Sequence, residues 1–237
     1  MHGTLPDELR KLLQSGTETN PALNTLLGDY RTYHAVLAIV GSIFLLGLIL
    51  LAVFCLRRFA RAPKVDGRRW TFEKKAFLAF GVLSVLVGLF MAFIVAANVS
   101  TVVSPREGFA GSIHLLSSPQ PGSSTADFYD SVTQWLQSEN ADTPAAVQSR
   151  IDERLSWQRP KAIICTVLLL LFLLVSALIW RSLIHWSRDP EARWRAKESA
   201  LLLLGVVTVL ACLLLMLMVM GNTQGAIAPI SLTLFFA

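Results

Sequence analysis

Charged residues are scarce in this chain, and cysteines are scarcer still. Asp, Glu, Lys and Arg make up 16% of the 237 residues, whereas 54% of them are hydrophobic. This balance excludes an ordinary soluble domain and indicates a polytopic membrane protein. The three cysteines, Cys55, Cys165 and Cys212, all lie in apolar segments. That placement argues against a disulfide framework, so we interpret them as small packing residues.

Four apolar runs are each near the roughly 20 residues that a helix needs to cross a bilayer. They are Ala35–Leu56, Ala76–Ala97, Ala162–Leu183 and Ser199–Met220. None has an Asp, Glu, Lys or His in its middle, which argues against a proton or ion relay. The sequence therefore predicts four transmembrane helices.

The basic residues predict the orientation of these helices. The two short loops that follow the first and third runs hold 13 of the 21 basic residues and five acidic ones. The positive-inside rule places both loops in the cytoplasm, with the termini and the middle segment outside the plasma membrane. The net charge of +5 is thus a topology signal, and we expect no nucleic-acid partner. An excess of arginine, 15 against 6 lysines, suggests a GC-rich bacterial genome, and the membrane is then expected to be a bacterial inner membrane.

An internal duplication is the main organising pattern of the sequence. The segment Arg69–Pro105 recurs at Arg193–Pro229 with a constant offset of 124 residues. The matching pairs are Arg69/Arg193, Trp70/Trp194, Asn98/Asn222 and Pro105/Pro229. We therefore predict repeat 1 at residues 1–105, an external linker loop at 106–125 and repeat 2 at 126–237. The expected fold is an all-α integral membrane protein, with four transmembrane helices as two tandem parallel two-helix repeats and short external amphipathic helices.

Short helices are predicted before each repeat from apolar stripes at helical spacing. The stripes are Leu5, Leu9, Leu12 and Leu13 in the first repeat, and Phe128, Val132, Trp135 and Leu136 in the second. Asn20-Pro21 and Thr143-Pro144 each read as a helix start. Asp66-Gly67 predicts the start of the second spanning helix.

The stretch Asn98–Thr125 has the composition of a loop, with Ser, Pro and Gly scattered through it. Asn98 and Asn222 are expected to cap the C-termini of the second and fourth spanning helices. Pro105 and Pro229 would then turn the chain away. The apolar tail Gly221–Ala237 is too short for a fifth crossing, so it suggests a partner surface or a position in the headgroup region.

Several residues are candidates for contact with a partner subunit. Ser84, Gly88, Ala92 and Ala96 are four residues apart and let two helices approach closely. This stripe predicts either a contact within the chain or a contact with another subunit. The apolar candidates in the external segments are Phe109, Leu115, Trp135, Phe235 and Phe236.

No motif in the sequence carries recognisable chemistry, so we expect no catalytic, cofactor-binding or metal-binding residues. Asp29 and Asp152 recur beside Arg31 and Arg154, but an i, i+2 pair does not meet on a helix. His34 and His114 have no second ligand at metal spacing, and Met216 with Met220 fits ordinary packing. No phosphate loop or nucleophile elbow is present.

The leading hypothesis is a non-catalytic accessory or assembly subunit of a larger membrane complex, with other membrane subunits and the bilayer as its partners. A second is a small oligomeric transporter or channel, because parallel repeats occur in transporters. A third is an outer-surface enzyme that acts on lipid through Asp29, Asp152 and the external Arg and His residues.

Overall fold

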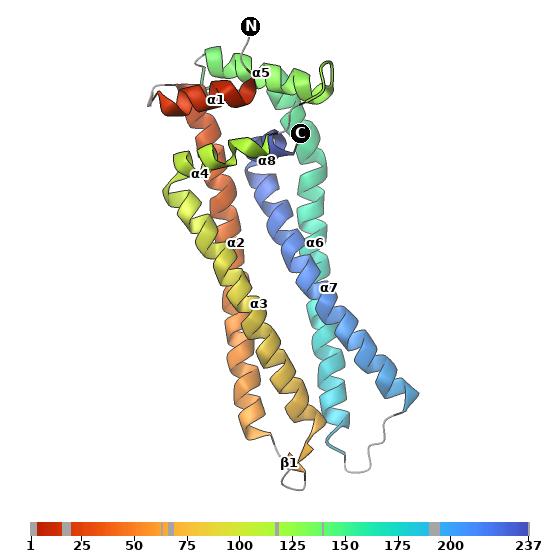
Figure 1. The fold of residues 1–237 in the computed structure, drawn as a ribbon. Coiled ribbons are helices and arrows are strands. Elements are labelled where there is room, and N and C mark those ends of the chain that lie inside the picture. The colour runs from red at the N-terminus through yellow and green to blue at the C-terminus, as the bar shows by residue number, and fades with distance from the viewer. Residues whose placement is uncertain are drawn as a thin grey trace. The chain divides into compact units, whose positions relative to one another are not determined.

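The computed structural model describes residues 4–15, 20–62, 64–65, 69–116, 119–138, 140–189 and 195–236. This part of the chain is helical except for one ladder of two-residue strands. The elements are α1 (Leu5–Gln14), α2 (Pro21–Arg61), β1 (Lys64–Val65), β2 (Arg69–Trp70), α3 (Phe72–Val103), α4 (Pro105–Ser112), the 3-10 helix η1 (Ile113–Leu115), α5 (Ser124–Ser138), α6 (Ala145–Trp186), α7 (Ala196–Ile227) and α8 (Pro229–Phe235). Figure 1 shows α3 running back alongside α2, and α7 running back alongside α6.

The chain divides into two compact units. The short-helix unit comprises Met1–Ile39, Ala96–Ala162 and Gly221–Ala237, and it holds α1, α4, η1, α5 and α8. The long-helix unit comprises Val40–Val95 and Ile163–Met220, which are the middle parts of the four long helices.

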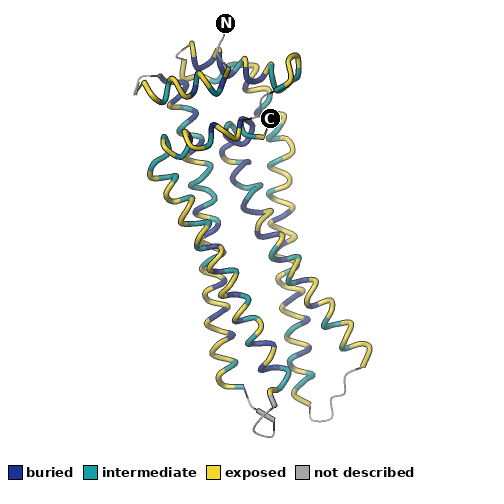
Figure 2. Tube along the Cα trace, in the orientation of Figure 1, coloured by how far each residue is buried: buried dark blue, intermediate teal, exposed yellow. Residues whose placement is uncertain are grey.

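The four predicted spans are confirmed as helices. Helices α2, α3, α6 and α7 contain 41, 32, 42 and 32 residues, and their most apolar windows have a mean hydropathy of 2.7 to 3.1. Each is long and apolar enough to cross a membrane. Only 22% to 33% of each window is buried, and Figure 2 shows exposed positions along all four helices. Their outer faces are therefore apolar and suited to lipid.

Small residues mark where the long helices touch. A Cβ placed at Gly41 would lie 2.9 Å from Val95 Cγ2 and 3.3 Å from Met220 Cε, and one at Gly205 would lie 3.1 Å from the Trp180 ring. These close approaches follow the general behaviour of membrane helices, whose contacts are enriched in glycine and other small residues.

The connection between α2 and α3 differs from the prediction. Strands β1 and β2 pair antiparallel, with Lys64 opposite Trp70, and α3 begins only at Phe72. Thr71 starts this helix, because its hydroxyl accepts a hydrogen bond from the Lys74 N–H at 3.2 Å. The predicted start at Asp66-Gly67 falls outside the described residues, as does the second-repeat pair Arg193-Trp194.

An ion pair with a buried carboxylate lies in the long-helix unit. The guanidinium of Arg188 donates to both carboxylate oxygens of Glu73, at 2.7 and 3.0 Å. The Glu73 side chain is only 11% exposed, whereas that of Arg188 is 55% exposed. This hydrogen bond and the negative charge of Glu73 raise the pKa of Arg188. A bidentate pair of this kind satisfies the buried carboxylate.

The short-helix unit has a hydrophobic core of its own. The residues of both predicted apolar stripes belong to this core or pack against it. Tyr30 and Phe109 meet edge to face, with ring centroids 5.1 Å apart. The core residues are Leu5, Leu9, Ala22, Leu23, Leu26, Tyr30, Phe109, Ile113, Leu116, Phe128, Tyr129, Val132, Trp135, Leu136, Val147, Ile151 and Leu234. Residues from three distant parts of the sequence thus share one interior.

Two sequence predictions for this unit are wrong. Residues 98–115 are helical except at Ser104, rather than a loop, because Phe109 and Ile113 are drawn into the core. Asn98 and Asn222 do not cap helix ends, since α3 continues to Val103 and α7 to Ile227. Pro105 and Pro229 instead begin α4 and α8, where a missing N–H costs nothing.

The apolar tail is mostly buried within the same unit. Leu234 of α8 is fully buried, and the Tyr129 hydroxyl donates to its carbonyl at 3.2 Å. The tail therefore completes the core and does not lie free as an apolar extension. Phe236 remains 63% exposed.

Candidate functional site

Polar side chains link the segments of the short-helix unit. The Asp29 carboxylate accepts a hydrogen bond from the Ser231 N–H at 2.6 Å, which joins α2 to α8. The Asn20 amide donates to the Leu136 carbonyl at 2.8 Å, and its Oδ1 accepts from the Leu23 N–H at 2.9 Å. Asn20 therefore caps α2, as the sequence predicts, and also ties it to α5.

The two histidines singled out in the sequence also have local partners. His34 Nδ1 lies 2.6 Å from the Asn98 Oδ1, and His114 Nδ1 lies 2.6 Å from the Gly111 carbonyl. Among the described residues, no group of three or more His, Cys, Asp or Glu side chains could hold a metal ion. His34 thus joins α2 to α3, and His114 bonds within its own turn.

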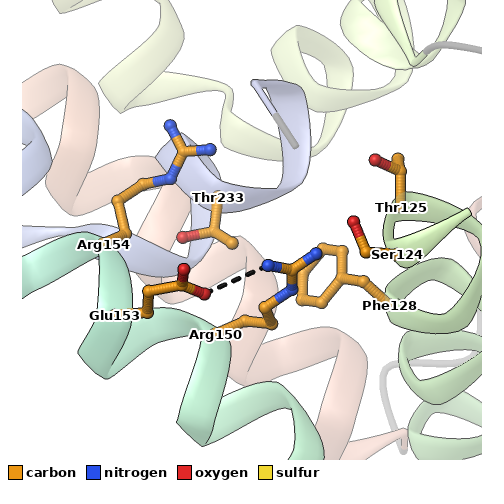
Figure 3. Close-up of a pocket in the computed structure, with 7 residues that line it drawn as sticks. All are labelled: Ser124, Thr125, Phe128, Arg150, Glu153, Arg154 and Thr233. Atoms are coloured by element: carbon orange, nitrogen blue, oxygen red, sulfur yellow. Dashed lines mark hydrogen bonds and ion pairs between the residues drawn. The ribbon is translucent and has the colours of Figure 1, made fainter.

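A hollow of about 290 Å³ lies on the short-helix unit. Its walls come from three helices, as Figure 3 shows. The lining residues are Ser124, Thr125 and Phe128 of α5, Arg150, Glu153 and Arg154 of α6, and Thr233 of α8. Their chemistry is two guanidinium groups, one carboxylate, three hydroxyls and one aromatic ring.

Two hydrogen bonds hold the arginines of this hollow. Arg150 Nη1 lies 3.0 Å from Glu153 Oε2, an exposed pair one helical turn apart. Arg154 Nη2 donates to the Phe236 carbonyl at 2.5 Å. With one carboxylate against two guanidinium groups, the lining carries a net positive charge. Exposed Phe236 lies directly beside it.

The residues that line the hollow limit the chemistry that they can support. Hydrolysis by a serine or threonine needs a base within hydrogen-bond reach of the hydroxyl. Ser124, Thr125 and Thr233 line the hollow together with no histidine. Its arginines are suited to holding a carboxylate or a phosphate group.

The residues that the sequence predicts as partner contacts differ in their exposure in the structure. Phe109 and Trp135 are 0% and 1% exposed in the chain's own core, so neither is free to contact a partner. Phe235 packs against that core. Leu115 and Phe236 are 61% and 63% exposed, and for these two residues partner contact stays a prediction.

The small-residue stripe of α3 is likewise partly buried and partly exposed. Ser84 and Gly88 are buried, Ala92 is partly buried and Ala96 is exposed. A Cβ at Gly88 would lie 3.9 Å from both Leu45 and Leu48 of α2. Gly88 therefore makes a helix contact inside the chain, which is one of the two roles that the sequence predicts for the stripe.

Sequence reasoning missed the hollow, although one signal for it was present. Arg150, Glu153 and Arg154 are spaced i, i+3 and i+4, so they share one face of α6. The spacing identifies the face but contains nothing about α5 or α8, which supply the other walls. The three cysteines are buried and free, in keeping with packing residues.

The fold is that of a helical membrane protein, with four helices able to span a bilayer and a second, separately packed helical unit. Comparison of the chain with protein-family models, curated proteins and solved structures finds no match to any of the three. The functional argument therefore depends on this chain's own residues.

Proposed function

We propose that this protein is a non-catalytic accessory or assembly subunit of a larger membrane complex. The observation that carries the proposal is that exposed Phe236, whose carbonyl accepts a hydrogen bond from Arg154, adjoins a hollow lined by Arg150 and Arg154. Aromatic and arginine side chains supply most of the binding energy at protein interfaces. Because the core of the unit is already complete, this surface is available to another polypeptide. We define Phe236, Arg150 and Arg154 as the docking surface.

The location of the docking surface follows from the charge bias. Under the positive-inside rule, the basic loops after α2 and α6 lie on the cytoplasmic side of a bacterial inner membrane. The short-helix unit then lies on the external side, and its partner is an external domain or a neighbouring membrane subunit. The bilayer itself covers the apolar outer faces of the long helices.

Three features support a tandem duplication with parallel repeats. Helices α3 and α7 are both 32 residues long. Each is followed by a single non-helical residue and then by a proline that begins a short helix. Those two residues, Ser104 and Ala228, have nearly the same backbone angles, with φ of −121° and −122° and ψ of 66° and 76°. We infer that the two halves arose from one ancestral hairpin.

The contacts of the external acids favour this proposal over a lipid-processing enzyme. Asp29 is committed to the Ser231 N–H, and Asp152 accepts a hydrogen bond from Gln148 at 2.9 Å on the same helix face. Carboxylates held in this way stabilise helices and their packing. The spans that a transporter would use lack the ionisable residues of a proton or ion pathway.

The test is purification from the native membrane in mild detergent, followed by mass spectrometry of the intact complex. A tag in the loop between α2 and α3 lies within the sequence of the long-helix unit and shares no residue with the docking surface. We expect other polypeptides at a fixed ratio. Phe236→Ala and Arg150→Ala should each weaken retention of the partner about fivefold or more, as interface anchors do.

Arg10→Ala is the matched control for Arg150→Ala. Both arginines form exposed ion pairs one turn along a helix, Arg10 with Asp7 at 3.2 Å and Arg150 with Glu153 at 3.0 Å. Only Arg150 lines the hollow, so Arg10→Ala should leave the complex intact. A lone monomer or homo-oligomer from the native membrane would overturn the proposal.

A further inference from the structure

A second and larger cavity lies in the long-helix unit. It has a volume of about 900 Å³ and is lined by α2, α3 and α6. Ligand pockets range from roughly 300 to 1,000 Å³, so this cleft has room for a sizeable molecule. It shares no residue with the docking surface, and its interpretation is independent of the proposed function.

The lining of the cleft changes from apolar to basic along two helices. On α2 it runs from Leu51 through Phe54 to Arg58, and on α6 from Leu173 to Arg181, with Arg188 just beyond the end of α6. At about 1.5 Å per residue, the two helical stretches cover roughly 10 Å and 12 Å. One end of the cleft is thus lined by leucine and phenylalanine, and the other by arginine.

Two arginines at the basic end have unused charge. Arg188 is paired with Glu73, but Arg58 and Arg181 have no salt bridge with any described carboxylate. Arg58 and Arg181 are both exposed. The Arg58 guanidinium lies 5.5 Å from the centre of the Phe54 ring, which holds it at the junction of the basic and apolar parts.

We propose that this cleft binds one anionic phospholipid of the surrounding membrane. The lipid phosphate lies between Arg58 and Arg181, and an acyl chain lies along Phe54, Phe80 and Leu173. Basic pockets between membrane helices suit anionic headgroups of this kind.

Two other occupants fit the cleft less well. A zwitterionic lipid adds a positive group where Arg58 and Arg181 already lie. A soluble anion would neutralise the arginines but leave the space along the aromatic wall unfilled. Only a molecule with a negative head and an apolar tail satisfies both ends.

The test uses the full-length protein, purified in a neutral detergent and stripped of lipid. Dioleoyl phosphatidylglycerol or dioleoyl phosphatidylcholine is titrated in, and bound lipid is counted by native mass spectrometry. We expect one phosphatidylglycerol per chain, and at least about tenfold weaker binding of phosphatidylcholine, since each arginine near a membrane surface contributes to anionic lipid attraction.

Two variants test separately the charge at the basic end of the cleft and the space along its apolar wall. Arg58→Gln with Arg181→Gln should weaken phosphatidylglycerol binding about 30-fold. The control Arg57→Gln removes an adjacent exposed charge that does not line the cleft, and should have little effect. Ala177→Trp fills the apolar wall with all charges intact and should also abolish binding. Its control, Leu174→Trp, lies on an exposed position outside the cleft.

Three outcomes would overturn the proposal. One is equal binding of the two lipids. Another is unchanged phosphatidylglycerol binding in both the double arginine variant and Ala177→Trp. The third is displacement of the lipid by millimolar inorganic phosphate, which would show that the cleft recognises only an anion. Because the two variants act through lost charge and lost space, the result does not depend on one substitution alone.

Discussion

Large apolar side chains of the short-helix unit are mostly buried in its core, whereas many of those in the long-helix unit face outward. In the short-helix unit, Trp135 and Phe109 are 1% and 0% exposed. In the long-helix unit, Phe93 and Leu170 are 72% and 63% exposed. The hydrophobic effect sorts side chains only where water is the alternative environment. In a bilayer the tails are as apolar as leucine, so close contact between small residues decides the packing instead.

The largest expected effect comes from the core of the short-helix unit. Trp135→Ala removes a buried ring and the hydrogen bond from its Nε1 to the Asn140 carbonyl at 2.9 Å. The free energy of unfolding should fall by about 3–5 kcal/mol. Chemical unfolding in detergent micelles, followed by circular dichroism, measures it.

Trp157→Ala is the matched control for this change, because Trp157 belongs to the same unit but is 67% exposed. It should alter the free energy of unfolding by no more than about 0.5 kcal/mol. Equal losses from the two substitutions would contradict a water-driven core in this unit.

An intermediate effect is expected from the ion pair of the long-helix unit. Glu73→Gln removes the charge that holds Arg188 and leaves a buried polar group less well satisfied. We expect a loss of about 1–2 kcal/mol, at the lower end for a buried pair because Arg188 is half exposed. Thermal unfolding in detergent gives the value.

The exposed ion pair of Arg150 and Glu153 in the short-helix unit provides the comparison for the pair of Arg188 and Glu73. Glu153→Gln breaks a contact of similar length, 3.0 Å, between side chains that are 36% and 64% exposed. Its cost should stay below about 0.5 kcal/mol. If Glu153→Gln costs as much as Glu73→Gln, burial is not what distinguishes the two pairs.

The smallest effects concern glycines at helix contacts. In Gly205→Ala the new methyl group would meet the Trp180 ring at 3.1 Å and Ile179 at 3.2 Å, so we expect a loss of about 1 kcal/mol. In Gly88→Ala the nearest atoms are 3.9 Å away, and the helix gains about 0.5–1 kcal/mol from the lost flexibility of glycine. Opposite signs in a detergent unfolding titration are the expected result. A stabilising Gly205→Ala would show that the packing around Trp180 is loose.

Patterns within a few residues of each other predicted much of this fold. The apolar runs identified α2, α3, α6 and α7, and Asn20-Pro21 marked the first residue of α2. The stripes around Leu9 and Trp135 identified the buried faces of α1 and α5. Each of these signals depends on hydrophobic periodicity or capping, which a single element contains in full.

Features that join distant segments could not be predicted in the same way. The hydrogen bond from Ser231 to Asp29 joins residues 202 positions apart, and that from Asn20 to Leu136 joins residues 116 apart. Neither partner indicates the other in the sequence. The stretch around Pro105 was misread because its Ser, Pro and Gly content favours a loop, whereas burial of Phe109 favours helix.

The hydrogen bond between Asp29 and Ser231 also has a consequence for biosynthesis. A ribosome adds roughly 5–20 residues per second. The 202 residues between these partners therefore take about 10–40 s to make, while both hairpins enter the membrane. For part of that interval Leu9, Leu23 and Leu26 lack the core partners that come later in the sequence. The nascent chain is thus exposed to chaperones and proteases until its second half arrives.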